Sequence, residues 1–216
     1  MSPTAKFNAL LASVTVMLMF FVVAYLAPIM RTAGVDYPAL LSIAALVTSA
    51  GVYRLLTLGL RWLMERIELL RGLVLGPYYM HGTWVGWFRG HSGELRYMVE
   101  HFAQDLDSLV ITGRSYTAAM KEHGYWVSES VTVDAKRGQL IFTYSFDVLT
   151  QSSSLAGIHT SIFERKSAHD APTGISGFAH DLNDKTRIAV HSKKVSSRLL
   201  SWEESLSQAA SLFKNV

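Results

Sequence analysis

The sequence predicts a membrane α-hairpin plus an all-β domain: two N-terminal transmembrane helices followed by an eight-stranded antiparallel β-barrel with a C-terminal helix. Two uncharged runs come early in the 216-residue chain, and after Gly76-Pro77 the helical periodicity gives way to alternation. The hairpin and a membrane-exit helix are assigned to residues 1–76, and the barrel to residues 77–216. The second part, about 140 residues, is long enough for one domain with its own core.

Two apolar runs predict the hairpin. Phe7 to Ile29 contains no charged residue, and at ~1.5 Å per residue it makes a helix of roughly 34 Å, against ~30 Å for the hydrocarbon core of a bilayer. Tyr37 to Tyr53 is also uncharged and continues to Leu60. Arg54 would extend its guanidinium toward the membrane surface, so a tilted second span is long enough. A very apolar soluble helical pair is the alternative.

The basic residues predict the orientation. Lys6 precedes the first run, and the second is followed by Arg54, Arg61, Arg66 and Arg71, whereas the connecting loop carries only Arg31 and Asp36. By the positive-inside bias, we expect a multi-pass protein of the cell inner membrane with the N-terminus and the barrel in the cytoplasm. A cleavable signal peptide is disfavoured because its apolar region should be shorter.

Charge and cysteine content exclude some functions. Residues 1–79 hold six basic and three acidic side chains, and residues 80–216 hold fourteen of each. The basic excess therefore lies beside the predicted membrane, where anionic headgroups attract it. A neutral second part disfavours polymeric nucleic acid as a partner. The absence of cysteine excludes disulfides and thiolate metal sites.

Residues 54–75 are predicted to form a helix that leaves the membrane. It would lie in the interface, pack on a copy of itself, or continue the second span as a rigid stalk. After it, turn residues separate eight candidate strands, namely Thr83–Phe88, Leu95–Phe102, Leu109–Tyr116, Trp126–Asp134, Gln139–Val148, Gly157–Glu164, Ile175–Leu182 and Arg187–Val195. A meander of this kind closes most economically into a barrel, which removes exposed edges. A two-sheet sandwich is the structural alternative.

The tail, Ser201 to Lys214, is predicted to be a helix. Ser201-Trp-Glu-Glu204 has the pattern of a capping box, and one side is apolar, with Leu199, Trp202, Leu206, Ala209 and Phe213. Such a helix would plug one end of the barrel or lie along its wall.

Enzyme signatures are missing, so we expect no enzyme. The chain has no phosphate-binding loop, no Gly-x-Ser-x-Gly and no His-Glu-x-x-His. Its eight histidines show no helical metal-binding spacing, and we expect neither a metal nor a cofactor.

A ligand cavity is better supported, because an eight-stranded barrel is just wide enough to hold one small molecule. The strands are rich in aromatic residues, and they carry Arg114, Glu129 and Arg187 away from the turns. Aromatic faces stack on planar rings and guanidinium groups bind phosphates. The purely structural interpretation is that aromatic residues at every second position form the core and that charged residues within strands face solvent.

Several short motifs follow the apolar hairpin in this order: Gly82-x-Trp84-x-Gly86, Thr112-Gly113, Gly124-Tyr-Trp126-x-Ser128, Leu140-x-Phe142-x-Tyr144, Gly157, and Gly177-x-x-x-Asp181 with Arg187. In these motifs and in architecture, the whole chain resembles the SMODS-associated two-transmembrane β-strand-rich (minimal β-barrel) effectors. These act in bacterial cyclic-oligonucleotide-based anti-phage signalling systems (CBASS).

The resemblance implies an anti-phage effector. A cognate nucleotidyltransferase would make a cyclic dinucleotide, the barrel would bind it, and the membrane helices would form a homo-oligomer that disrupts the inner membrane and kills the cell. The residues expected to line the pocket are Trp84, Arg114, Trp126, Glu129, Thr143, Tyr144 and Arg187. The aromatics would stack on bases, the two arginines would meet phosphates, and Glu129 or Thr143 would recognise a base edge. On this view Arg114→Ala abolishes binding.

Two other functions remain open. One is a membrane-tethered, lipocalin-like carrier or sensor of a lipid or other apolar ligand, which should have a uniformly apolar lumen. The other is a membrane-bound hydrolase that uses histidine and aspartate residues of the strands.

Overall fold

The computed structural model describes residues 3–32, 38–90, 92–149, 154–182 and 187–213. Within these ranges the side chains of 26–27, 30–31, 38–49 and 154 are left undescribed. The chain divides into two compact units, Met1–Val74 and Leu75–Val216, and each is considered by itself.

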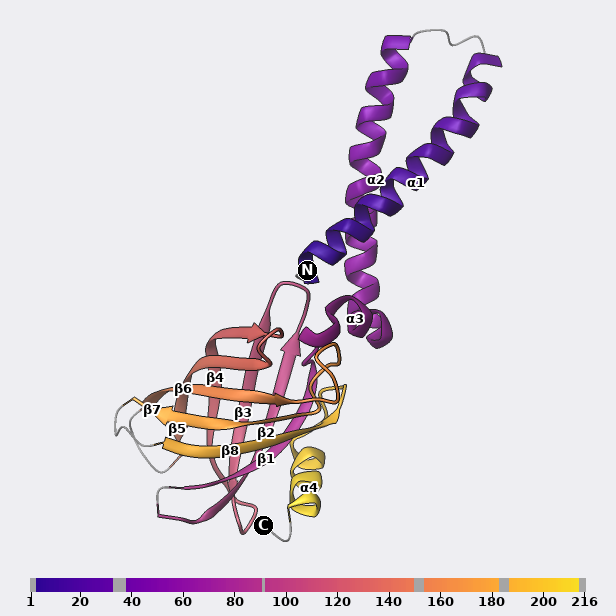
Figure 1. Ribbon diagram of the computed structural model, residues 1–216. Coiled ribbons are helices and arrows are strands. Elements are labelled where there is room, and N and C mark those ends of the chain that lie inside the picture. Colours follow the sequence, from indigo (N-terminus) through magenta and orange to yellow (C-terminus); the bar gives the residue numbers. More distant parts are fainter. Residues whose placement is uncertain (1–2, 33–37, 91, 150–153, 183–186, 214–216) are drawn as a thin grey trace. The chain divides into compact units, whose positions relative to one another are not determined.

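The first unit contains three helices: α1 (Pro3–Thr32), α2 (Pro38–Arg66) and α3 (Glu68–Leu75) (Figure 1). Within the described part of the chain, one helical segment, Pro3–Tyr25, is long and apolar enough to cross a membrane. Several of its large apolar side chains are exposed, among them Val16, Phe20 and Tyr25, whereas Phe7 and Leu11 are buried.

Of the two predicted spans, the first therefore has the length and composition that a membrane span needs, and the hairpin itself stays a prediction. The second apolar run does lie in a helix, α2, but most of that run falls among residues whose side chains are outside the described part. The described portion of α2, from residue 50 on, carries Arg54, Arg61, Glu65 and Arg66. These charges interrupt the apolar stretch that a membrane span requires.

The expected continuous helix over 54–75 is broken at Ile67, between α2 and α3. The side chain of Arg71 turns back and donates hydrogen bonds to the backbone oxygens of Met64 (3.1 Å) and Glu65 (2.7 Å). These carbonyls belong to the last turn of α2, which has no intrahelical donors left. Arg71 thus caps α2 and stabilises the break.

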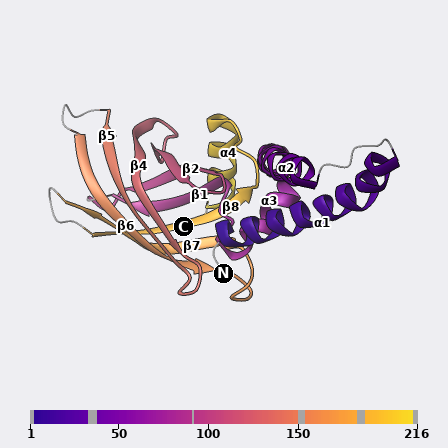
Figure 2. The same cartoon turned by 90° about the horizontal axis from the view of Figure 1, so that it is seen from above.

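The second unit is a closed barrel of eight antiparallel strands in sequence order, with the last paired to the first (Figures 1 and 2). The strands are β1 (Gly82–Arg89), β2 (Leu95–Gln104), β3 (Leu109–Thr117), β4 (Glu122–Asp134), β5 (Gln139–Val148), β6 (Ser154–Glu164), β7 (Gly174–Asp181) and β8 (Arg187–Ser196). The predicted barrel is confirmed and the sandwich is excluded. The main differences in extent are the earlier starts of β4 and β6, where Gly124 pairs with Val148 and Ser154 with Asp147.

A bulge in β4 decides which side chains face inward. The pairing with β5 shifts between Ser128 and Ser130, leaving Glu129 as the extra residue. An extra residue exchanges the two faces of a strand. Trp126 therefore points inward before the bulge and Val131 after it, and both pack in the interior cluster.

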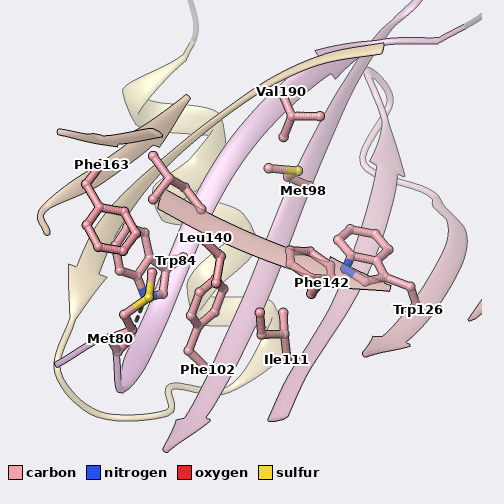
Figure 3. Close-up of a cluster of buried hydrophobic side chains, with 11 residues drawn as sticks. Met80, Trp84, Met98, Phe102, Ile111, Trp126, Leu140, Phe142, Phe163 and Val190 are labelled. Atoms are coloured by element: carbon pink, nitrogen blue, oxygen red, sulfur yellow. Dashed lines mark hydrogen bonds between the residues drawn. The ribbon is translucent and has the colours of Figure 1, made fainter. Parts of the chain in front are cut away.

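One end of the barrel is closed by packed side chains (Figure 3). Trp84, Phe102 and Leu140 are fully buried there. The rings of Trp84 and Phe102 stack with their centroids 5.1 Å apart, and the indole N–H of Trp84 donates to the backbone oxygen of Met80 at 2.9 Å. This layer seals the end at which the chain enters β1.

The C-terminal helix α4 (Trp202–Leu212) lies along the outer wall of β1 and β2 rather than plugging an end (Figure 2). The side-chain oxygen of Ser201 accepts a hydrogen bond from the backbone N–H of Glu204 at 3.2 Å, as the capping pattern predicts. Ala209 packs against Val85 and Val99 of the wall. The predicted last residue, Lys214, lies outside the described residues.

Candidate ligand cup

Between the sealed layer and the other end, the barrel holds a cavity of about 120 Å³, here called the cup. It is mostly apolar, and its lining residues are Phe88, Met98, Glu100, Trp126, Phe142, Tyr144, Phe146, Leu155, Ala156, His159, Ala179, Asp181, Ile188 and Val190. An engineered cavity of ~150 Å³ in another protein holds one benzene. The cup therefore has room for about one ring.

The exposure of the inward-facing side chains shows which end opens. Trp84 and Leu140 at the sealed end have no exposed surface, whereas Phe88, Phe146 and Ile188 toward the other end are half-buried. These three lie near the last residues of β1 and β5 and the first of β8. The mouth of the cup is thus at the barrel end opposite the one at which β1 begins.

A carboxyl group is buried in the wall of the cup. Glu100 of β2 is 2 % exposed. The hydroxyl of Ser192 donates to its Oε2 at 3.0 Å, and the indole N–H of Trp126 also hydrogen bonds to it. Burial raises the pKa of Glu100 to about 7, although both hydrogen bonds act in the opposite direction.

An imidazole is buried in the same cup. His159 of β6 is 4 % exposed and its ring stacks on Phe142 with centroids 4.6 Å apart. Its Nε2 makes no hydrogen bond to any described residue. Burial lowers the pKa of His159 to about 4, so the ring is neutral at physiological pH. A buried polar atom without a partner is costly, so this nitrogen is suited to a hydrogen bond with a polar ligand group.

Of the residues expected to line the pocket, Trp126 and Tyr144 do line the cup. Trp84 also points into the barrel, but it belongs to the sealed layer beneath the cavity. The remaining four lie elsewhere.

Arg114, Glu129, Thr143 and Arg187 are on the outer wall or at the bulge. The guanidinium carbon of Arg114 lies 4.6 Å from the ring centroid of Trp202, and Nη1 contacts Glu122 at 3.2 Å. The guanidinium carbon of Arg187 lies 3.6 Å from the ring centroid of Phe178.

Thr143 shares a hydrogen bond of 2.8 Å with Ser130, and Glu129 is exposed. Successive side chains of a strand point to opposite faces, so a residue next to an inward-facing one points outward.

The sequence interpretation missed Glu100, His159 and Asp181, the charged or titratable residues that line the cup besides Tyr144. A signal for the first was present. Glu100 lies midway between Met98 and Phe102 in a period-two pattern that is otherwise apolar, which places a carboxyl on the buried face. His159 shows no such contrast, because serine and glycine occupy the neighbouring inward positions of β6.

The arrangement is suited to binding a flat, uncharged ring. Five aromatic side chains provide faces, and Glu100 and His159 provide hydrogen-bonding groups. None of the described lining residues is a lysine or arginine, so a phosphate group has no cation inside the cup. Within the described ranges, no three histidine, aspartate or glutamate side chains are grouped to hold a metal ion.

The chain was compared with protein-family models, with curated proteins and with solved structures. None of the three comparisons gave a match.

The pH dependence of stability tests the two buried groups. Glu100 has a raised pKa, so it favours the folded state at low pH, and this contribution is lost between about pH 4.5 and 7. His159 has a lowered pKa, so its contribution is gained between about pH 4 and 6.5. The two largely cancel in the wild type. Relative to it, we expect the unfolding free energy of Glu100→Gln to rise by about 2–3 kcal/mol over pH 4 to 7, and that of His159→Phe to fall by a similar amount.

Urea denaturation of the full chain in detergent, followed by circular dichroism at several pH values, measures these differences. Parallel pH profiles for the wild type and both variants would show that neither group is buried as described. Glu203→Gln on the exposed face of α4 serves as the control.

Proposed function

We propose that this chain is a membrane-anchored cyclic-dinucleotide receptor and an effector of CBASS anti-phage defence. A base of the ligand enters the cup, and binding drives the helices to assemble and disrupt the inner membrane. The observation that supports this most is the cup itself, an aromatic-lined cavity with two buried polar groups.

The size and chemistry of the cup favour a nucleobase over a hydrocarbon chain. A cavity of about 120 Å³ accepts one base and leaves the sugar-phosphate ring at the mouth. A base stacks on aromatic rings and offers hydrogen-bonding edges to Glu100 and His159. A hydrocarbon chain would cover Nε2 of His159 without giving it a partner, at a cost of about 1–3 kcal/mol.

The phosphates would then be bound outside the cup. Among the described residues, three exposed cations border its mouth: Arg89 at the end of β1, Lys121 before β4 and Arg187 at the start of β8. Guanidinium groups bind phosphates through paired hydrogen bonds. Arg187 thus keeps the role that the resemblance gives it, but at the rim, whereas Arg114 on the α4 side loses that role.

The output requires coupling between the cup and the helices. A ligand shifts an assembly equilibrium only by its difference in affinity for the two states. Confinement to a membrane raises the local concentration of the helices, so a coupling free energy of roughly 1–3 kcal/mol is enough. In this proposal the apolar run before Arg54, continued to Leu60 with the Arg54 guanidinium at the membrane surface, is the second span. The barrel lies in the cytoplasm.

A lipocalin-like carrier or sensor of an apolar ligand is the second candidate. Two observations favour it: most of the lining is apolar, and the described lining contains no cation.

Calorimetry of the full chain in lipid nanodiscs distinguishes the candidates. We expect one member of a panel of cyclic di-AMP, cyclic di-GMP, cyclic di-UMP and the mixed AMP–GMP ring to bind. Mass spectrometry of the purified protein should find no stoichiometric lipid in the barrel. A co-purified fatty acid, together with no heat from any cyclic dinucleotide, would select the carrier.

Substitution of the two arginines gives opposite results under this proposal. Arg114→Ala should leave the affinity for the bound cyclic dinucleotide within about twofold, and should weaken the docking of α4, because it removes a cation–π contact of ~0.5–1 kcal/mol. Arg187→Ala should lower the affinity at least fivefold, since a rim phosphate loses a charged partner. The same calorimetry measures both. If Arg114→Ala abolishes binding while the barrel stays folded, the ligand does not bind in the cup.

A further inference from the structure

Glu100 and His159 face each other across the cup. β2 and β6 are four strands apart in the closed ring of eight, and Figure 2 shows them on opposite sides of the barrel. Glu100 pairs with Trp84 and Gly113, and His159 with Phe142 and Ala179. Both side chains line the cavity. A ring in the cup therefore lies between the two groups.

We propose that Glu100 and His159 hold opposite edges of one flat, neutral heterocycle, each through a hydrogen bond. This deepens the proposed function, on which it rests, by naming what the cup recognises in its ligand. The ligand class is a single ring with polar atoms on two opposite edges, as in uracil. A ring with one polar edge would contact only one of the two groups.

The hydrogen bonds already present support this assignment. Both partners of Glu100, the hydroxyl of Ser192 and the indole of Trp126, are placed as donors. When its carboxyl carries a proton, that proton can go to the Ser192 hydroxyl, which also accepts hydrogen bonds, or to an acceptor atom on the edge of a bound ring. On the opposite wall, Nε2 of His159 has no partner among the residues described. The wall with His159 thus lacks one hydrogen bond among the described residues, and on the other wall Glu100 offers a carboxyl group that can contact a ring edge.

The neutrality of the ring follows from burial. Desolvation shifts the pKa of Glu100 upward and that of His159 downward, in both cases toward the neutral form. The other titratable groups lining the cup are Tyr144 and Asp181, and the latter lies at the last residue of β7, near the mouth. An anionic ring would be desolvated without a buried counter-charge, because none of the described lining residues is a lysine or arginine.

Three variants of the full chain in nanodiscs test the proposal, with the same four cyclic dinucleotides as probes. His159→Phe keeps the ring that stacks on Phe142 and removes the polar edge, so we expect about a tenfold loss of affinity for the best ligand. Glu100→Gln keeps a donor and an acceptor but fixes their positions, so we expect it to change the order of preference among the four. His159→Asn restores a polar group and should recover part of the loss.

The controls are His169→Phe in the exposed loop before β7 and Glu203→Gln on α4. Neither should change affinity or preference, and circular dichroism should show all variants folded. A purely structural role would lower the affinity for all four probes equally, so an unchanged order of preference in Glu100→Gln overturns the proposal. So does unchanged affinity in His159→Phe, and then the proposed function still stands. If none of the four binds the wild type, both fall.

Discussion

Trp84→Ala is expected to lower the unfolding free energy of the barrel by about 3–5 kcal/mol. Trp84 has no exposed surface, stacks on Phe102 and donates a hydrogen bond to the backbone of Met80. Truncation removes the indole from the sealed layer, leaves a cavity, and deprives the Met80 carbonyl of its donor. Since domains commonly have 5–15 kcal/mol of stability, this single change consumes a large part of it.

Urea denaturation of the full chain in detergent, followed by far-ultraviolet circular dichroism, measures the loss. Trp87→Ala is a matched control, because Trp87 is on the same strand but on the outer wall, half-buried and stacked on His191. We expect a loss of about 1 kcal/mol for the control. Equal losses for the two variants would mean that the two faces of β1 are misassigned.

Gly113→Ala is expected to cost about 1–3 kcal/mol and to abolish ligand binding. A Cβ at Gly113 would lie 2.1 Å from Cε2 and 2.2 Å from Cζ2 of the Trp126 indole on the neighbouring strand. Contacts under 3 Å force a shift. The indole lines the cup, so its displacement changes the cavity as well as the packing.

A second substitution separates the local clash from a general weakness of β3. In Gly113→Ala/Trp126→Val, the atoms that the new methyl group meets are absent. The double variant should therefore be more stable than the sum of the two single losses, and the difference is the interaction energy of a double-mutant cycle. Strict additivity would show that Gly113 does not cradle the indole.

Alternation and turn residues made the strand count predictable. Most strands have a run of period two, and most of the runs are separated by glycine, proline, asparagine or aspartate, with three serines between the fifth and the sixth, so eight strands follow. When each strand pairs with the next one in the sequence, the only pairing that remains to be inferred is that of the last strand with the first. Closure was the economical solution because it removes both edges, and β1 does pair with β8.

The residues that line the cup were less predictable, because they depend on which alternate side chains of each strand point into the barrel. The aromatic residues Trp126 and Tyr144 were assigned inward correctly, since large apolar groups favour the interior. The arginines were taken inward on the chemistry of a phosphate ligand, yet Arg114 lies outside against Trp202 of α4. No sequence pattern showed that α4 would cover that wall. A cation on a strand can contact an aromatic residue of a docked helix instead of a ligand.

The bulge at Glu129 marks a second limit of sequence interpretation. Simple alternation through β4 gives two incompatible faces, because valines follow on one parity and Trp126 precedes on the other. One extra residue reconciles them and turns Glu129 out to solvent. The position of such an insertion depends on the register of β5, which the sequence of β4 alone does not contain.

The pairing of β1 with β8 also determines when the barrel can form during synthesis. Residues 3–25 leave the ribosome long before Arg187–Ser196, and elongation proceeds at about 5–20 residues per second. Until β8 emerges, one edge of β1 has no partner and remains open to adventitious pairing with other chains. The other free edge belongs to the last strand made, so an open sheet presents two edges until β8 pairs with both β1 and β7.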